Sequence, residues 1–274
     1  MRVNLMSKSW LRWLSWFLFA SLFAAACVGL ASWQFDRRDQ AVSKIQRMVD
    51  NYERPAISFD SISSLPLADV TSFEWTPVEL TGTYLTSQEL LVRNRPIAGQ
   101  PGFIQLIPFQ LANGEIVIIE RGWIPANSEL EPATSMTPSE QPKTLIARVR
   151  LSELTPNRNS PEGFATSIHL ESLENTLGVP LEQEFYLRVI SENPSEATSP
   201  QPLSKPTLDE GNHLSYAVQW ILFALMGFFA LFWAIRQEQE YRRIDRDPTY
   251  VPRSKRNRKR TDGDIEDELL DARN

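Results

Sequence analysis

A histidine stands among polar and aromatic residues directly before a long apolar run near the end of the chain. The segment GNHLSYAVQW (211–220) contains His213, and ILFALMGFFALFWAI (221–235) follows it. A polar side chain at the end of a membrane helix costs free energy unless it has a partner. A neutral imidazole can ligate a metal, including haem iron, so His213 is a candidate ligand. The alternative is a histidine that only hydrogen-bonds within an aromatic-rich membrane interface.

The helix that follows must place this histidine. At 100° per residue, one face of the helix carries His213, Ala217, Trp220, Ala224 and Gly227. The small residues on this face would let another helix or a flat ligand approach closely. The first apolar segment ends at Trp33 and Gln34. We therefore expect aromatic residues from both helices to meet near His213, with Trp220 and Trp33 as candidate covers for a flat ligand.

The rest of the chain carries no recognisable catalytic constellation. His169, in SIHLESLE, is expected to be a surface or helix-capping histidine. The sequence contains no nucleophile elbow, zinc-protease helix, phosphate-binding loop or dinucleotide fingerprint. Cys27 is the only cysteine, so the chain can form no internal disulfide and no thiolate metal site. These features predict that the protein is not an enzyme and has no dedicated metal site.

Four arginines are further candidates for binding carboxylates or phosphates. Arg93 and Arg95 alternate in LLVRNRP and would share one strand face, where pairing with local glutamates is the plainer expectation. Arg121 opens RGWIP, and the glycine and tryptophan after it indicate a specific tight corner. Arg37 follows the first apolar segment and could meet lipid phosphate.

Two uncharged runs of roughly 20 residues predict transmembrane helices at 13–33 and 214–235, because about 20 residues cross the hydrocarbon core. Basic residues precede the first run and follow the second, which assigns 1–12 and 236–274 to the cytoplasm. A cleavable signal peptide is the alternative for the first run, but its apolar stretch is longer than such signals need. The protein is thus expected to be a multi-pass protein of a bacterial inner membrane. Residues 34–212 would form a periplasmic domain, and the charged tail would be largely disordered.

The middle of the chain is acidic, with 14 Lys and Arg against 24 Asp and Glu between residues 36 and 212. After a helix that ends before Pro55, β-rich runs predict strands at 75–85, 89–96, 103–111, 115–125, 144–154 and 184–192. A hairpin is expected around Thr86–Gln88 and another at Asn113-Gly114. Residues 169–180 predict a helix, and 126–142 and 191–206 read as an exposed loop and a linker. The fold class is a membrane protein with two transmembrane α-helices flanking an α+β, mainly antiparallel β extracytoplasmic domain.

Three segments in this order resemble the surfeit-locus family of cytochrome oxidase assembly factors. They are WQFDRRDQAVSK (33–44), the stretch 90–125 that ends in RGWIP, and NHLSYAVQW (212–220). The resemblance implies assistance with haem a insertion, or stabilisation of the catalytic subunit, in a haem-copper oxidase. It also implies that His213 is a haem a contact.

The partners expected from this resemblance are the oxidase catalytic subunit, the haem a synthesis machinery and membrane lipid, and we expect no nucleic acid. Two alternatives remain open at this point. One is a membrane-anchored scaffold or chaperone that binds no haem, in which His213 only hydrogen-bonds. The other is an envelope protein unrelated to respiration.

Overall fold

The computed structural model describes residues 5–127, 131–134, 136–155, 160–182 and 184–246. Its contacts divide the chain into two compact units. We call Met1–Asp39 with Gly211–Asn274 the helix unit, and Gln40–Glu210 the barrel unit. Most of the charged tail expected to be disordered, from residue 247 on, lies outside the described residues.

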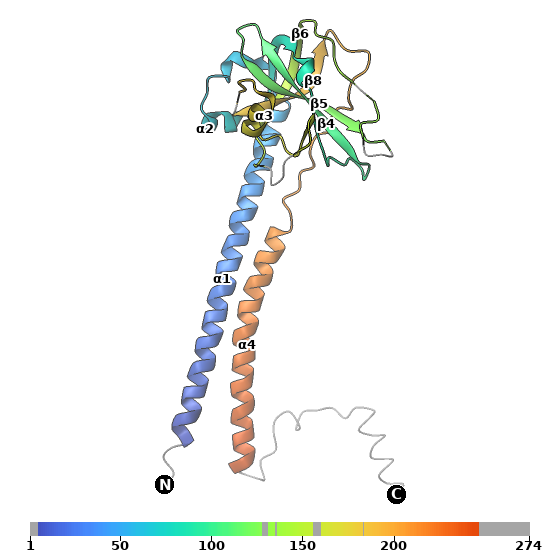
Figure 1. Cartoon of the computed structure of the whole chain (residues 1–274). Helices are drawn as coiled ribbons and strands as arrows, with labels where there is room; N and C mark the ends of the chain where they lie inside the picture. Colours follow the sequence, from blue (N-terminus) through green and yellow to red (C-terminus); the bar gives the residue numbers. More distant parts are fainter. Residues whose placement is uncertain (1–4, 128–130, 135, 156–159, 183, 247–274) are drawn as a thin grey trace, which may run out of the picture. The chain divides into compact units, whose positions relative to one another are not determined.

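The helix unit contains two long helices that run side by side (Figure 1). Helix α1 spans Leu5–Tyr52, and its last residues belong to the barrel unit. Helix α4 spans His213–Arg246. Both are long and apolar enough to cross a membrane, and only 17% and 6% of their most apolar windows is buried. Because large apolar side chains cover their outer surfaces, neither helix resembles the core helix of a soluble protein.

The two helices meet along stripes of small residues. On α1, Ala20, Cys27 and Ala31 are buried at spacings of seven and four residues. On α4, Ala217 is fully buried, whereas Leu214 and Val218 beside it are exposed. This is the α4 face predicted from the sequence, and small side chains let the two backbones approach.

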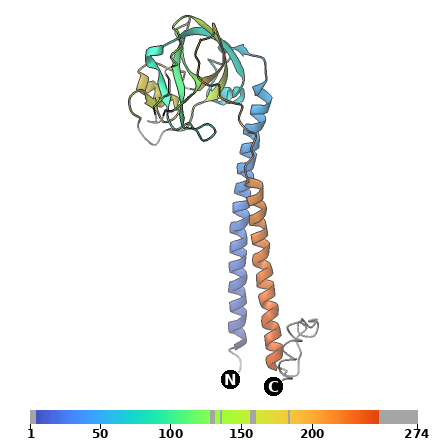
Figure 2. The same cartoon turned by 90° about the vertical axis from the view of Figure 1, so that its right-hand side faces the viewer.

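The barrel unit is built around a closed ring of five strands, β2, β6, β8, β5 and β4, each paired with the next. Pairing between β2 and β4 completes the ring, and the strands curve around a common interior (Figure 2). Short strands β1, β3 and β7 extend the sheet outside this ring. The β5–β8 pair is parallel, while the other four ring pairs are antiparallel. The strand bounds are β1 Ile57–Ser58, β2 Pro77–Tyr84, β3 Leu90–Val92, β4 Gly102–Leu111, β5 Ile116–Pro125, β6 Lys143–Leu151, β7 Phe164–Ala165 and β8 Phe185–Asn193.

Apolar side chains fill the barrel and cover one of its outer faces. The inner cluster includes Val117 and Ile119, and it continues into the segment containing helix α2 (Leu67–Val70), which contributes Val70 at one end of the barrel. A second cluster lies outside, where helix α3 (Leu170–Leu177) packs over Ile116 and Ile118. Alternate residues of β5 therefore enter different cores, which confirms the prediction of a central strand with two apolar faces.

Most strand predictions are confirmed, and the Asn113-Gly114 hairpin is correct. Gly114 has φ 89°, its amide donates to the Leu111 carbonyl, and the Leu111 amide donates to the Glu115 carbonyl. This is a three-residue hairpin loop with glycine at the left-handed position. The helix expected before Pro55 is also confirmed, as is the helix ending at Gly178, whose φ is 68°.

The hairpin expected around Thr86–Gln88 is wrong. These residues form a short 3₁₀ helix, and β2 pairs with β4 and β6 instead of β3. The preceding strand must close the ring, so its next neighbour along the chain is displaced to the outside. Strand β3 also ends at Val92, earlier than expected, because Asn94 adopts a left-handed conformation with φ 58°.

Two segments read as exposed are partly packed against the barrel. Met136 in the loop 126–142 contributes its carbonyl to a buried arginine, and Pro138 is buried. In the linker 191–206, Gln201 pairs with Trp123 through two backbone hydrogen bonds of 2.8 Å. Proline-rich composition thus marked irregular backbone correctly, but it did not distinguish packed from free segments.

Candidate functional site

His213 begins helix α4, and its partner on α1 is Gln34. The His213 Nδ1 atom lies 2.9 Å from the Gln34 Oε1 atom. An amide oxygen only accepts hydrogen bonds, so in the assigned amide orientation Nδ1 carries the hydrogen. In a neutral ring, the Nε2 atom then keeps its lone pair. The contact therefore links the two helices and also fixes the tautomer of the imidazole.

Small residues lie next to this histidine along the chain, and an aromatic residue lies two turns further on the same helix face. Gly211 has φ 71°, and a Cβ built on it would stand 3.4 Å from the His213 ring. Ala217 is fully buried one turn further along α4, and Trp220 is half-buried with its ring 5.7 Å from that of Phe223. The backbone thus approaches one side of the imidazole closely, and a left-handed glycine permits this.

The role of Trp33 as a cover for a flat ligand stays a prediction. Trp33 is 53% exposed, and its ring lies beneath the Arg37 guanidinium of its own helix at 5.9 Å. The preceding stripe on α1, Ala20, Cys27 and Ala31, leads to Gln34 instead. Gln34 was the residue that sequence reasoning missed, although its spacing of three from Ala31 placed it on the packed face.

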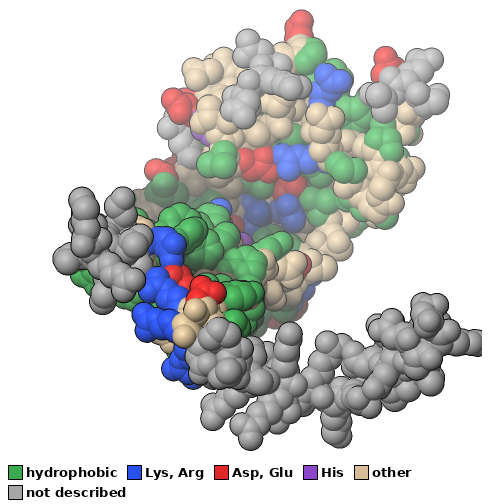
Figure 3. Space-filling model, turned by 90° about the horizontal axis from the view of Figure 1, so that it is seen from below, with side chains coloured by type: hydrophobic (Ala, Val, Ile, Leu, Met, Phe, Trp, Pro, Cys, Tyr) green, Lys and Arg blue, Asp and Glu red, His purple; other side chains and the backbone are tan. Residues whose placement is uncertain are grey.

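The opposite end of the helix pair carries a second polar link. Arg12 on α1 forms an ion pair with Glu238 on α4, and Arg242 pairs with the same carboxylate at 2.5 Å. An apolar groove of about 860 Å³ runs beside this link, lined mainly by aromatic and small residues such as Trp16, Phe23 and Gly227. Figure 3 shows basic side chains gathered at this end of the helices, next to their hydrophobic surface.

In the barrel unit, Arg121 occupies a bulge in strand β5. Gln105 of β4 faces Gly122 and Leu106 faces Glu120, so Arg121 is the extra residue between them. Such a bulge re-aims a side chain. The Arg121 side chain is fully buried at one end of the barrel, over the ring of Tyr84 at 5.3 Å.

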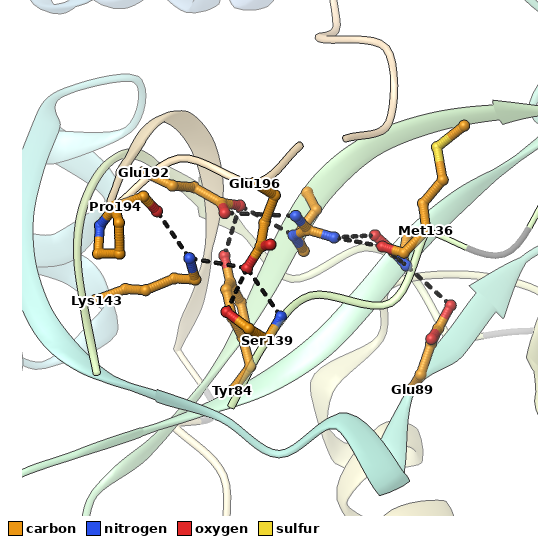
Figure 4. Close-up of polar contacts among 10 residues, drawn as sticks. Tyr84, Glu89, Met136, Ser139, Lys143, Glu192, Pro194 and Glu196 are labelled. Carbon is orange, nitrogen blue, oxygen red and sulfur yellow. Dashed lines mark hydrogen bonds and ion pairs between the residues drawn. The ribbon is translucent and has the colours of Figure 1, made fainter. Parts of the chain in front are cut away.

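All three nitrogens of the Arg121 guanidinium donate hydrogen bonds, and Figure 4 labels their partners Glu192 and Met136. Its Nε atom donates to Glu192 at 2.9 Å and Nη2 donates to the same carboxylate at 3.4 Å. Its Nη1 atom donates to the Gln105 amide oxygen at 2.9 Å and to the Met136 carbonyl at 2.7 Å. The Tyr84 hydroxyl also donates to Glu192, and burial raises the pKa of Tyr84 well above its usual range. Arg121 therefore joins four segments of the barrel and is not available to an outside carboxylate.

A second buried cation completes this end of the barrel. The Lys143 Nζ atom lies 2.8 Å from Glu196 and donates to the Pro194 carbonyl at 2.7 Å (Figure 4). The Ser139 amide and hydroxyl donate to the same glutamate at 2.8 and 2.6 Å. Hydrogen bonds from Lys143 and Ser139 lower the pKa of Glu196 to about 2. The loop after β5 and the segment after β8 are thus fastened to one another.

The remaining residues of RGWIP also have structural roles. A Cβ on Gly122, whose φ is 150°, would lie 2.6 Å from the Gln201 carbonyl oxygen. Trp123 exchanges backbone hydrogen bonds with Gln201, and its indole donates to the Arg95 carbonyl at 2.6 Å. The tight corner predicted from the sequence is wrong, because strand β5 continues through these residues and carries a bulge at Arg121 instead.

Arg93 and Arg95 do not share a strand face, but both line one pocket of about 320 Å³. Arg95 is paired with Glu153 at 2.5 Å, which confirms the prediction of pairing with a glutamate. Arg93 is exposed and has its guanidinium 5.5 Å from the Phe164 ring. No carboxylate among the described residues pairs with it.

His169 caps helix α3, as expected. Its Nδ1 atom accepts from the Ser172 amide at 3.3 Å and contacts the Ser172 hydroxyl at 2.7 Å. Its Nε2 atom lies 3.4 Å from the Thr155 hydroxyl. Both ring nitrogens are thus used in local structure.

Comparison with known proteins finds one matching family and several relatives. The model of the SURF1 family matches residues 21–225, which includes the Gln34–His213 pair and the whole barrel. A SURF1-like protein of Mycobacterium bovis, described as uncharacterized, is 29% identical over 230 residues, covering 80% of this chain and 83% of its own. A SURF1-like protein of Rickettsia bellii is 26% identical over 199 residues, covering 70% and 78%. One of Drosophila melanogaster is 24% identical over 241 residues, covering 80% and 76%. The chain belongs to the SURF1 family, the surfeit-locus family known in general for cytochrome oxidase assembly.

Proposed function

We propose that this protein is a membrane-anchored assembly factor for a haem-copper cytochrome c oxidase, and that it holds haem a as cargo through His213. Family membership supports the oxidase role. The observation that carries the haem proposal is the hydrogen bond between His213 Nδ1 and Gln34 Oε1. Histidines that ligate a metal almost always donate their other ring nitrogen to an acceptor, which fixes the tautomer and the ring orientation.

The residues beside His213 are compatible with a haem cargo. One neutral imidazole can supply one axial nitrogen. Gly211 places no side chain beside the His213 Nε2 atom, where a Cβ would stand 3.4 Å away, and Trp220 offers an aromatic surface on the same helix face. The role proposed for the protein's own residues is binding and orientation, without chemistry on a substrate. The protein would therefore not be an enzyme.

The proposed location follows from the two helices and their basic flanks. With α1 and α4 crossing a bacterial inner membrane, the basic ends at Arg12 and Arg242 would face the cytoplasm. The barrel unit would then lie in the periplasm, and the exposed apolar helix surfaces would contact lipid. The proposed protein partners are the oxidase catalytic subunit and the haem a synthesis machinery.

A scaffold that binds no haem is the second candidate, and the same hydrogen bond favours it. His213 and Gln34 tie α4 to α1, so the histidine has a structural role without any ligand. In this case the protein would hold the catalytic subunit during assembly, and haem would not affect that contact. The two candidates therefore differ in whether His213 is needed for haem or only for helix packing.

The deciding experiment is purification of the full chain from cells that make haem a, followed by a visible absorption spectrum. Wild type is expected to carry haem a, His213→Ala to lose it, and Gln34→Leu to bind it about 10- to 100-fold more weakly. His169→Ala is the matched control, since it removes the other histidine of the chain. Equal haem in His213→Ala and His169→Ala would refute the haem contact at His213, and no haem in wild type would favour the scaffold.

A further inference from the structure

The pocket beside Arg93 is the strongest unassigned site of the barrel unit. It is lined by Arg93, Asn94 and Arg95 on one side and by Pro96, Pro101, Gly102, Phe103 and Ala126 on the others. Two of these residues are charged, and Pro96, Pro101 and Phe103 supply most of the apolar side-chain surface of the walls. A cation at the rim of an apolar pocket suits a ligand that carries a carboxylate next to an apolar group.

The two arginines differ in whether a carboxylate pairs with them. Arg95 is already paired with Glu153, and both side chains are about 30% exposed. Arg93 has only the Phe164 ring beneath it among the described residues, and that ring packs on Phe103 at 5.9 Å. A guanidinium stacked on an aromatic ring keeps its donor edge free for a carboxylate. The guanidinium N–H groups of Arg93 are therefore available to pair with a carboxylate in the pocket.

The backbone around the pocket is held in an unusual but fixed conformation. Asn94 and Ala98 both have positive φ, at 58° and 52°, and neither is glycine. The Arg93 amide donates to Ala165 and the Arg95 amide donates to Gly102, so the loop is anchored on both sides. Asparagine adopts this region readily and alanine does so rarely, so the hydrogen-bonded anchors, not the residue types alone, hold the loop in this shape.

We propose that this pocket binds an acidic side chain of a partner protein, with an apolar residue next to the acidic one. Charge complementarity selects a carboxylate, since Arg93 has no carboxylate partner among the described residues. A volume of about 320 Å³ is at the lower end of ligand pockets and suits one or two side chains, not a large cofactor. Burying an anchor residue in such a pocket is the usual basis of a binding hot spot. The proposal is independent of haem binding at His213.

The test uses the full chain in detergent micelles with ¹⁵N-labelled tryptophan. Trp123 reports on the pocket, because its ring packs on Gly102 and its indole donates to the Arg95 carbonyl. The probe is the blocked peptide acetyl-Leu-Glu-Leu-amide, with acetyl-Leu-Gln-Leu-amide as its neutral match and 3-phenylpropionate as a small carboxylate. We expect the Glu peptide to shift the Trp123 indole signal with a dissociation constant of about 1 mM or tighter.

The variants separate the pocket from general charge effects. Arg93→Gln should weaken binding of the Glu peptide roughly tenfold or more, the loss of one charge-assisted contact. Arg54→Gln, which removes an exposed arginine outside the pocket, should leave it unchanged. Equal shifts with the Glu and Gln peptides, or equal affinities in Arg93→Gln and Arg54→Gln, would overturn the proposal. Binding of 3-phenylpropionate without binding of the Glu peptide would overturn the protein partner in favour of a small carboxylate.

Discussion

Removing the buried arginine at the end of the barrel is expected to destabilise the barrel unit strongly. In Arg121→Ala, the Glu192 carboxylate would lose two hydrogen bonds and the Gln105 amide oxygen and Met136 carbonyl would each lose one. The Arg121 side chain is 0% exposed and that of Glu192 is 9% exposed, so the lost contacts lie in a buried site. Breaking a buried ion pair by removing one partner costs about 3–5 kcal/mol.

This cost is large compared with the stability of an ordinary domain, which is about 5–15 kcal/mol. The assay is urea unfolding of the full chain in non-ionic detergent, followed by tryptophan fluorescence. Arg95→Ala is the matched control, because it breaks an ion pair whose side chains are 31% and 30% exposed. This pair is only partly buried, and exposed pairs contribute about 0–1 kcal/mol, so the control should lower the free energy of unfolding clearly less than Arg121→Ala does.

A second pair of variants tests the cause of the effect. If the cost comes from an uncompensated buried charge, Arg121→Ala combined with Glu192→Gln should recover part of the stability lost by Arg121→Ala alone. Replacing both partners by apolar residues, as Arg121→Met with Glu192→Leu, removes the buried charge but should still be destabilising, because the Tyr84 hydroxyl, the Gln105 amide oxygen and the Met136 carbonyl lose their partners. If Arg121→Ala and Arg95→Ala lower the free energy of unfolding by equal amounts, the structural role assigned to Arg121 is refuted.

Three further outcomes are expected. Because the folded state lowers the pKa of Glu196 to about 2, its contribution to stability is present above the ordinary value of 4.5 and is lost as the pH falls from there to about 2; Glu196→Gln should flatten this part of the pH dependence of urea unfolding. Gly122→Ala should cost clearly more than Gly163→Ala in the same assay, since both glycines have positive φ but only the Cβ at 122 would collide with backbone. His169→Ala should cost about 1 kcal/mol by removing the cap of α3, whereas His169→Asp should stay near wild type; equal costs for the two would argue against capping.

The local parts of the fold could be predicted from the sequence, because their causes are local. The Asn113-Gly114 hairpin needs only a glycine at a left-handed position between two apolar runs. The end of α3 at Gly178 has the same kind of cause. Alternation along 115–125 also indicated a strand with two buried faces. These patterns act over a few residues and leave their mark in composition.

Pairings between distant segments could not be predicted in the same way. Strand β2 pairs with β4 and β6 because the ring must close, and nothing near Thr86–Gln88 signals this. The role of Arg121 was open for a similar reason, since Glu192 lies 71 residues away. At the helix pair, Trp33 was chosen as a candidate because it is aromatic. The hydrogen-bond partner of His213 is Gln34, which continues the stripe of small residues on α1.

The position of β8 in the ring has a consequence for the order in which the chain can fold. Strand β8 lies between β5 and β6, so both of these strands have an unpaired edge until Phe185–Asn193 has been synthesised. Unpaired edges of apolar strands invite pairing with other chains. A nascent chain that stops before β8 would therefore expose two such edges. Only about 20 residues separate the end of β8 from the start of α4, so barrel closure and the arrival of the second long helix fall close together in time.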